Sequence, residues 1–437
     1  MGERTVTRIR CVTAIISLLL LSAECYAQST AVPFLIIPTS VEGNGMGGIA
    51  ASMVTEDAIS NISNPAQLGV FSLENSFSAS TYAPKTDWLP SFGGGLSLDA
   101  RAVSAGLRLD RYMKLPAPIS VGIGYSTVYF NLGTFNTFTP NNPSAVSTYN
   151  AFERADMLTF GVGINYIVRL GLGYTYKWID SELAPFGPGQ QIGSGAAKAP
   201  AHDFGALLQV PVIDIVSRIQ QRPLEFGNGV SPLFNLTFGW AERNIGGDLY
   251  YPFQQQSDPL PRQGVLGWNF EIGLQTEVNH QPLKIVSFTW AREAENILVS
   301  VQTTATPQPS GDTLYSNQFS YKDGLGSMRP YDNLFLGKIT GGMTVQKGWQ
   351  IDIAQCLYFR EGSDSPFGGF PYQTHGESFH LNGFLKLLAW IGVWHPWHGW
   401  GAFVLKHIDL QYSTSEYTSQ SNIISGTKFS SLNIVFR

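Results

Sequence analysis

The sequence predicts an all-β protein: a transmembrane antiparallel β-barrel of about 14 strands with an N-terminal hatch in its lumen. Two observations carry this prediction. Short runs of alternating bulky and small or polar residues fill most of the chain, and charged residues make up only 14% of it while aromatic residues make up 13%. Soluble domains carry about 25% charged residues, whereas a barrel with one apolar wall and one polar wall needs fewer.

The first residues have the pattern of a secretory signal peptide. A basic start precedes an apolar stretch at residues 14–21, and small residues precede a cleavage point after Ala27. We expect residues 1–27 to direct export and to be removed. Lipidation at Cys25 is disfavoured because Glu24 breaks the small-residue requirement before such a cysteine.

The mature chain then has neither a disulfide framework nor an obvious membrane-spanning helix. Cys356 is the one cysteine left after cleavage, which excludes an internal disulfide. The longest apolar stretch, residues 384–393, is interrupted by Lys386 and Gly392 and is shorter than a spanning helix requires. Any membrane span must therefore be made of strands.

From residue 75 onward, period-two alternation predicts strand after strand. In residues 121–125 and 160–164 the bulky side chains alternate with glycine, so we expect one apolar wall and an opposite wall that is nearly bare. The domain prediction is a hatch over residues 28–73 and a barrel over residues 74–437. Candidate strands lie at residues 75–82, 92–99, 102–109, 120–131, 158–168, 171–179, 203–210, 233–241, 268–278, 283–293, 296–303, 333–346, 349–360, 377–388, 404–414 and 429–436.

Long polar insertions separate some of these strands. Structureless segments of this length are uncommon in compact domains but expected as the external loops of a barrel. On the opposite side we expect short turns, at residues 100–101, 110–118 and 169–170. The long insertions are residues 135–150, 182–201, 246–263, 304–328 and 361–376.

The segment ahead of the strands carries three short motifs, namely Pro33-Phe34-Leu35, Gly45-Met46-Gly47 and Asn64-Pro65-Ala66-Gln67-Leu68. Proline restricts the preceding residue to extended backbone, an asparagine side chain can brace neighbouring backbone groups, and glycine permits close approach to a barrel wall. We therefore take Gly45, Met46, Gly47, Asn64, Pro65 and Ala66 as the residues that seat the hatch. A fixed plug with no role in transport remains the alternative.

These motifs, in this order and spacing, resemble the N-terminal hatch of the FadL-like outer-membrane barrels, and most closely its PorV/PorQ branch. The resemblance covers residues 33–70 and is architectural beyond them. The PorV/PorQ branch implies a binding or shuttle partner for secreted cargo in type IX secretion at the outer membrane. The wider FadL-like group implies passage of long-chain fatty acids or other hydrophobic molecules. Expected partners are outer-membrane lipids, together with secretion-apparatus proteins and cargo or with a hydrophobic ligand.

Other functions lack support in the sequence. A net charge of -5 without a basic run disfavours nucleic acid. The signatures of hydrolases, metalloproteases, nucleotide-binding loops and paired-cysteine redox sites are missing, so we predict no enzymatic activity and no cofactor. Glu293 and Glu295 flank Arg292, and we expect this pair to be solvated lumen wall rather than an acid and a base.

Residues 394–400 form the densest aromatic cluster of the chain, with Trp394, Trp397 and Trp400 around His395 and His398. Two histidines could share a metal ion, but the remaining ligands are missing. Tryptophans at a strand end are typical of the aromatic girdle that anchors a barrel at the level of the lipid headgroups. We predict the girdle and no metal.

Overall fold

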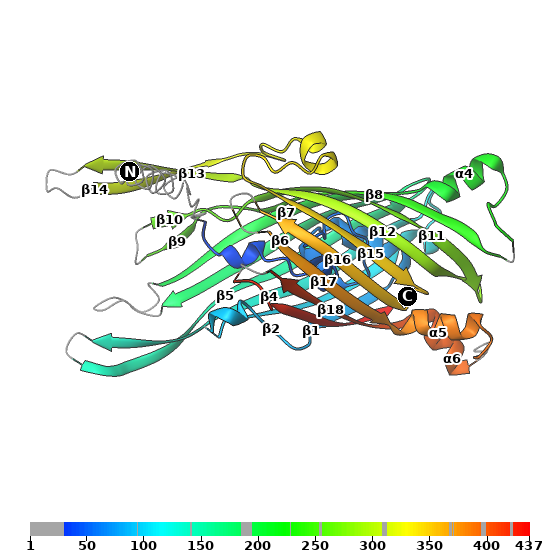
Figure 1. Ribbon diagram of the computed structural model, residues 1–437, viewed down its shortest axis with the longest axis horizontal. Helices are drawn as coiled ribbons and strands as arrows, with labels where there is room; N and C mark the ends of the chain where they lie inside the picture. The colour runs from blue at the N-terminus through cyan, green and yellow to red at the C-terminus, as the bar shows by residue number, and fades with distance from the viewer. Residues whose placement is uncertain are drawn as a thin grey trace, which may run out of the picture.

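The chain forms one closed antiparallel barrel (Figure 1). The computed structural model describes residues 30–93, 95–139, 142–184, 195–227, 229–252, 256–307, 313–366, 369, 371–394, 399–419 and 423–437, so the expected signal peptide lies outside the described residues. One sheet contains 15 strands in these ranges, and β1 pairs with both β3 and β19, which closes the ring. The two-residue β2 (Thr86–Asp87) is a spur on β3, so the barrel proper has 15 − 1 = 14 strands. The predicted fold class is confirmed.

The barrel strands follow one another in chain order around the ring, apart from small excursions at the ends. They are β1 (Phe77–Tyr82), β3 (Ser97–Arg108), β4 (Ile119–Thr139), β5 (Asn142–Asn165), β6 (Arg169–Ala184), β7 (Gly195–Pro211), β8 (Ser231–Gly246), β11 (Gln263–Val278), β12 (Gln281–Ile297), β15 (Met343–Ile353), β16 (Leu357–Ser365), β17 (Tyr372–His380), β18 (Ile408–Thr418) and β19 (Lys428–Phe436).

The two ends of the barrel differ, as predicted. At the long-loop end, on the left of Figure 1, β4 and β5 project beyond the wall and two extra hairpins form. These hairpins are β9 (Leu249–Tyr251) with β10 (Gln256–Asp258) and β13 (Val299–Pro307) with β14 (Thr313–Tyr321). At the short-turn end, the connections are tight or carry α4 (Val212–Gln220), α5 (Leu381–Trp390) and α6 (Gly399–His407). Several long insertions are thus strand extensions rather than structureless loops.

Several sequence predictions of strand boundaries are wrong. The predicted strand 333–346 begins in the helical turn η5 (Tyr331–Phe335) and becomes a strand only at Met343, and the predicted strand 404–414 begins in α6 and becomes a strand only at Ile408. No turn occurs at residues 100–101, because β3 continues through them and its inward and outward phase is unbroken. The predicted strand 349–360 is split by a turn in which Ala354 and Gln355 have left-handed backbone, with φ of 57° and 51°. The predicted strand 377–388 ends at His380, where α5 begins, since the apolar residues that follow recur with a helical rather than a strand period.

The outer wall carries a band of large apolar side chains, which we call the apolar belt. Its members alternate with inward-facing small or polar residues, as in β4, where Val121, Ile123 and Tyr125 point outward. No helix in the described part of the chain is long and apolar enough to cross a membrane. The belt comprises Phe77, Val103, Leu107, Val121, Ile123, Tyr125, Phe160, Val162, Leu172, Phe204, Phe238, Ile272, Val286, Phe288, Ile353, Leu357, Phe359, Phe379, Leu410, Tyr412 and Leu432.

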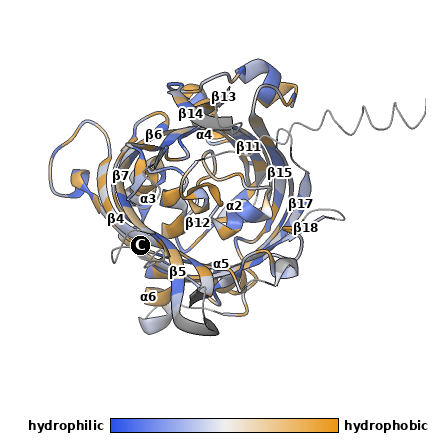
Figure 2. Cartoon of the chain, turned by 90° about the vertical axis from the view of Figure 1, so that its left-hand side faces the viewer, coloured by the Kyte–Doolittle hydropathy of each residue, from blue (hydrophilic) through white to orange (hydrophobic). Residues whose placement is uncertain are grey.

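The lumen is occupied by residues 30–74, which we call the luminal segment. It contains η1 (Pro33–Ile36), α2 (Val41–Gly45), η2 (Ala58–Ile62) and α3 (Ala66–Glu74), and Figure 2, which looks along the barrel from the long-loop end, shows α2 and α3 inside the ring. Ser40 caps α2 by accepting a hydrogen bond from the Gly43 amide, and Asp57 caps η2 through the Ile59 amide. Each cap satisfies one amide that the start of the helix would otherwise leave unpaired.

The luminal segment touches the wall backbone to backbone, along inward-facing glycines that we call the glycine track. Neighbouring strands place these glycines directly opposite one another, in the register Gly106, Gly122, Gly161, Gly173 and Gly205 from β3 to β7. A Cβ on any of them would overlap the segment or press against it. The track continues through Gly239, Gly267, Gly348, Gly362 and Gly376 around the ring. Glycine here provides room for a second backbone.

Replacing Gly173 by alanine tests this contact. Its Cβ would overlap the carbonyl group of Pro65, so either the wall or the segment must shift, and we expect a loss of about 1–3 kcal/mol of unfolding free energy. The measurement is urea unfolding of the detergent-solubilised barrel, followed by tryptophan fluorescence. Gly247→Ala is the control, because a Cβ at that position would have no atom of the described residues within 4 Å. Equal stability of the two variants would contradict the proposed tight contact.

Candidate functional site

The middle of the luminal segment is held by hydrogen bonds from the wall. On β12, Glu293 Oε2 accepts from the amides of Ala51 at 3.1 Å and Ser52 at 3.3 Å, and on β11 Asn269 Nδ2 donates to the Ser52 carbonyl at 2.5 Å. Glu293 is only 3% exposed. The expectation that this carboxylate is solvated lumen wall is therefore wrong, because the amides of the segment take the place of water.

The predicted Gly45-Met46-Gly47 motif lies against β15, β16 and β17. The Gly47 amide donates to Thr374 Oγ1 at 2.8 Å, and the same hydroxyl donates to the Gly45 carbonyl at 3.0 Å. Met46 is fully buried, and its backbone lies on the glycine track at β15 and β16. The three residues Gly45, Met46 and Gly47 are thus brought together at one wall contact.

The predicted motif that begins Asn64-Pro65-Ala66 lies across the lumen, on β6 and β7. Asn64 Nδ2 donates to the Ala51 carbonyl at 2.7 Å, while its Oδ1 accepts from the Ala66 amide at 3.0 Å. Pro65 and Ala66 rest on the glycine track. Asn64 thereby joins two stretches of the segment that are 13 residues apart in the chain.

Glu56 joins the luminal segment to the seam where β1, β18 and β19 meet. Arg437 Nη2 donates to the two carboxylate oxygens of Glu56 at 2.8 and 3.0 Å, and Gln411 Nε2 donates at 3.0 Å. The Glu56 carbonyl accepts from Ser78 Oγ at 3.0 Å and from Asn433 Nδ2 at 3.4 Å. Burial alone would raise the pKa of Glu56, but the guanidinium of Arg437 outweighs it and lowers that pKa.

Two further acids of the luminal segment, Glu42 and Asp57, have pKa values that shift in opposite directions. Glu42 lies 3.5 Å from Arg360 Nη2 and 3.8 Å from His380 Nε2. Burial opposes its charge, but Arg360 and His380 lower the pKa of Glu42 to about 2. For Asp57, which accepts from the Ile59 amide at 2.9 Å, burial and the nearby Glu42 raise the pKa to about 6.

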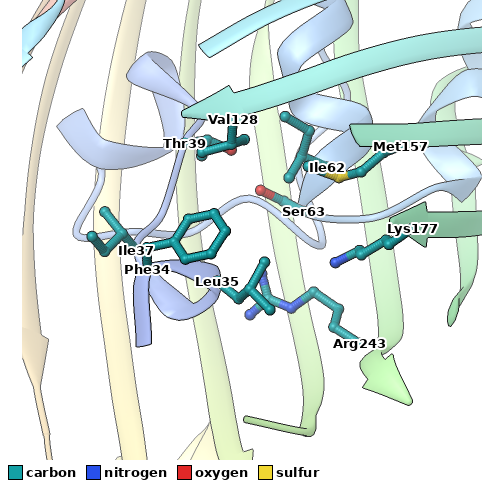
Figure 3. Close-up of a pocket in the computed structure, with 10 residues that line it drawn as sticks. All are labelled: Phe34, Leu35, Ile37, Thr39, Ile62, Ser63, Val128, Met157, Lys177 and Arg243. Carbon is teal, nitrogen blue, oxygen red and sulfur yellow. The ribbon is translucent and has the colours of Figure 1, made fainter. Parts of the chain in front are cut away.

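Residues 32–37 of the luminal segment differ from these anchored parts. Among the described residues their hydrogen bonds stay within the segment, and they meet the wall through apolar side chains such as Phe34, which stacks on Phe130 with ring centroids 6.4 Å apart. Beneath them lies a small pocket of about 10 Å³, room for one water molecule. Figure 3 shows its lining, which consists of Phe34, Leu35, Ile37, Thr39, Ile62, Ser63, Val128, Met157, Lys177 and Arg243.

Both cations in this lining already have partners. Lys177 Nζ lies 2.8 Å from Asp203 Oδ2 and donates to Asn244 Oδ1 at 2.7 Å. Arg243 Nη2 donates to Glu295 Oε2 at 3.0 Å, and Arg243 Nε has no hydrogen-bond partner in the described residues. The pocket therefore combines a largely apolar lining with paired charges and, among the described residues, two polar atoms without a hydrogen-bond partner, Arg243 Nε and Thr39 Oγ1.

The tryptophan cluster is placed differently from the prediction. Trp394 follows α5 and Trp400 lies in α6, so the cluster belongs to a helical connection at the short-turn end rather than to a strand end. Trp397, His395 and His398 lie outside the described residues. The predicted girdle role stays a prediction.

Sequence reasoning missed Lys177, Arg243 and Glu56 as residues of the lumen. The signal for Lys177 is present in the sequence, because it shares the inward phase of β6 with Thr175 and Ile179 while bulky aromatic residues occupy the outward phase. Glu56 carries no such signal, since its partners lie 355 and 381 residues away.

Comparison with known proteins adds little to this description. No family model matches the chain, and no curated protein matches it. Solved structures similar to it include the TodX deltaS2S3 mutant monoaromatic hydrocarbon channel, with 10% identity, 91% of this chain and 98% of that chain covered, and a TM-score of 0.38. The CymD monoaromatic hydrocarbon channel has 11% identity, 91% and 96% coverage and a TM-score of 0.34. The translocator domain of the autotransporter NalP from Neisseria meningitidis has 9% identity, 83% and 87% coverage and a TM-score of 0.27. Because these scores are low, the fold rests on the strand pairings alone.

The raised pKa of Asp57 generates a pH-dependent prediction. Between its ordinary value near 3.8 and the folded value of about 6, the folded protein holds a proton that the unfolded chain releases, so the wild type loses stability as the pH rises through this window. The Asp57→Asn variant keeps an acceptor for the Ile59 amide without the charge. We expect the variant to exceed the wild type by about 1–3 kcal/mol above pH 6 and the difference to vanish below about pH 4.

Urea unfolding of the detergent-solubilised barrel across this pH range measures the effect. Asp323→Asn serves as the control, because the Asp323 side chain is 95% exposed and its replacement should leave the profile unchanged. A pH-independent difference between Asp57→Asn and wild type would contradict the assignment.

Proposed function

We propose that the protein spans the outer membrane, with the apolar belt in contact with lipid and the long-loop end facing outward. The belt runs along every face of a closed wall whose backbone groups are paired, which is the arrangement that lipid requires. Long hairpins at one end and short connections at the other fit the usual asymmetry between the external and periplasmic sides.

We further propose that the barrel admits a hydrophobic small molecule from the long-loop end to the pocket beneath residues 32–37. The observation that carries this proposal is the division of the luminal segment. Its anchored parts are held by hydrogen bonds and by the glycine track, whereas residues 32–37 contact the described part of the wall through apolar side chains alone. An apolar ligand can replace those contacts without breaking a hydrogen bond between segment and wall.

Because the pocket is small, side chains around it must move before a ligand can enter. With room for one water, it accepts a ligand only if side chains such as Phe34 and Leu35 move aside. Val32 supports such a movement, since its φ of 46° is unusual for a β-branched residue and marks local strain beside the pocket. The anchored part need not leave the lumen.

The charges around the pocket favour an uncharged ligand. Lys177 and Arg243 are matched by Asp203 and Glu295, so a carboxylate ligand would have to compete with buried carboxylates for them. A hydrocarbon, or a molecule with one neutral acceptor for Arg243 Nε, meets no such competition.

Overfilling the pocket tests the proposal. Val128 on β4 is buried and lines the pocket, and Val128→Trp would occupy the volume that a ligand needs. A steric cost of about 1–3 kcal/mol corresponds to a loss of binding of roughly fivefold to 150-fold. Uptake of a radiolabelled aromatic hydrocarbon, and separately of a long-chain fatty acid, by cells producing each variant measures it.

Val103→Trp on the neighbouring β3 is the matched control, because Val103 points outward and is 44% exposed. Both variants should reach the outer membrane in equal amounts, and only Val128→Trp should lose uptake. If wild type and Val128→Trp take up both probes equally, the pocket is not on the route.

A role as a binding or shuttle partner in type IX secretion stays a prediction that rests on the sequence resemblance. Mass spectrometry of the lipids and proteins retained after mild detergent extraction separates the two functions. A hydrophobic molecule without a protein partner supports passage through the lumen, whereas a stoichiometric secreted protein or a very large barrel partner supports secretion.

A further inference from the structure

The connection between β17 and β18 is a pair of helices, α5 and α6, at the short-turn end. Figures 1 and 2 both show the pair beside the outer wall of the barrel rather than in the lumen. It is bonded firmly to the barrel. The Asn382 amide donates to Asp409 Oδ1 on β18 at 2.8 Å, and Arg437 Nη1, after β19, donates to Asn382 Oδ1 at 3.0 Å.

The polarity of α5 differs from that of a helix on a water-soluble protein, although Ala389 on its protein-facing side packs into an apolar cluster with Val278 and Leu283. Its protein-facing side carries Asn382 and Lys386, both nearly inaccessible, and Lys386 Nζ donates to the Pro282 carbonyl at 3.2 Å. Gly383, on the same side, fits so closely that a Cβ would overlap the Gln355 carbonyl. In water a surface helix turns its apolar side to the protein and its polar side outward.

The side of the pair that faces away from the barrel is apolar and aromatic. On α5 it presents Phe384 and Trp390, and Ile391 and Val393 follow directly after the helix. On α6, Trp400 is 82% exposed and Phe403 packs edge to face against it, with ring centroids 5.9 Å apart. We call these six side chains the helical patch: Phe384, Trp390, Ile391, Val393, Trp400 and Phe403.

The helical patch is continuous with the apolar belt. Phe384 contacts Phe379, with ring centroids 6.0 Å apart, and Phe379 is the belt residue of β17, directly opposite Leu357 on β16 and Tyr412 on β18. The exposed apolar surface thus passes from three strands onto the helices without a polar break at this contact.

We propose that the helical patch binds the phospholipid leaflet at the short-turn end. The inference rests on the proposed placement of the belt in a membrane. Lipid is the occupant that the observations favour, because the patch extends a surface already assigned to lipid and carries two tryptophans, which favour the headgroup level. A separate protein-binding patch would need a boundary against the belt, and the Phe379–Phe384 contact joins the two surfaces.

Site-directed fluorescence in phospholipid vesicles tests the inference. Cys11, Cys25 and Cys356, of which Cys356 lies in the described residues and is buried, are replaced by serine in the full-length chain. Single cysteines at Ile391 and Trp400 then receive an environment-sensitive fluorophore. Leu172→Cys in the belt is the lipid-facing control and Asp323→Cys at the long-loop end is the water-facing control.

We expect a phospholipid spin-labelled near its headgroup to quench the labels at positions 391 and 400 as strongly as the label at position 172. Aqueous iodide should quench only the label at position 323. Iodide quenching at positions 391 and 400, with position 172 still quenched by lipid, would overturn the inference and leave the membrane placement intact. Labels shielded from both quenchers would also overturn it, because a second protein would then cover the patch. Failure of lipid quenching at position 172 would overturn the membrane placement itself.

Discussion

Close contact between two backbones is the constraint on which the rest of the molecule depends. The luminal segment passes from one side of the lumen to the other within van der Waals reach of the wall, and this is possible only where the wall has no side chain. The strand register brings the required glycines opposite one another from β3 to β7. Each of these glycines weakens its own strand, so packing against the segment has to compensate for the side chains that the wall lacks.

Because of this arrangement, the hydrogen bonds and ion pairs between the wall and the segment lie in a few places. Glu293 and Thr374 bind backbone groups of the segment, and Arg437 pairs with the carboxylate of Glu56 in the segment. Leaving such a buried group without its partner costs about 1–3 kcal/mol. The stretch over the pocket has no such bonds and is held by apolar contact. Moving the hydrogen-bonded parts of the luminal segment would therefore require a large free energy, whereas residues 32–37 have contacts that we propose a hydrophobic molecule can replace.

The sequence predicts the barrel and the position of the luminal segment because both depend on local patterns. Alternation with glycine in β4 and β5 indicates two unlike walls, and the hatch motifs lie at wall contacts near residues 45–47 and 64–66. Helix α5 was missed because its apolar residues continue directly from β17, so that a strand pattern and the start of a helical pattern overlap at His380. The partners of Glu56 and Glu42 come from strands hundreds of residues away and follow from closure of the ring, which no local pattern encodes.

The contacts of Glu56 change how deletion experiments on this protein should be interpreted. Its carboxylate and carbonyl together bind side chains from β1, β18 and β19 and the residue after β19, which is where the ring closes. Deleting the luminal segment would thus have two effects. It would empty the lumen, and it would remove the contacts of Glu56 that hold β1, β18 and β19 together. Leakage through such a truncated barrel would not measure the width of an emptied channel, because a ring opened along one joint leaks as well. Shorter deletions that retain Glu56 keep the two effects apart.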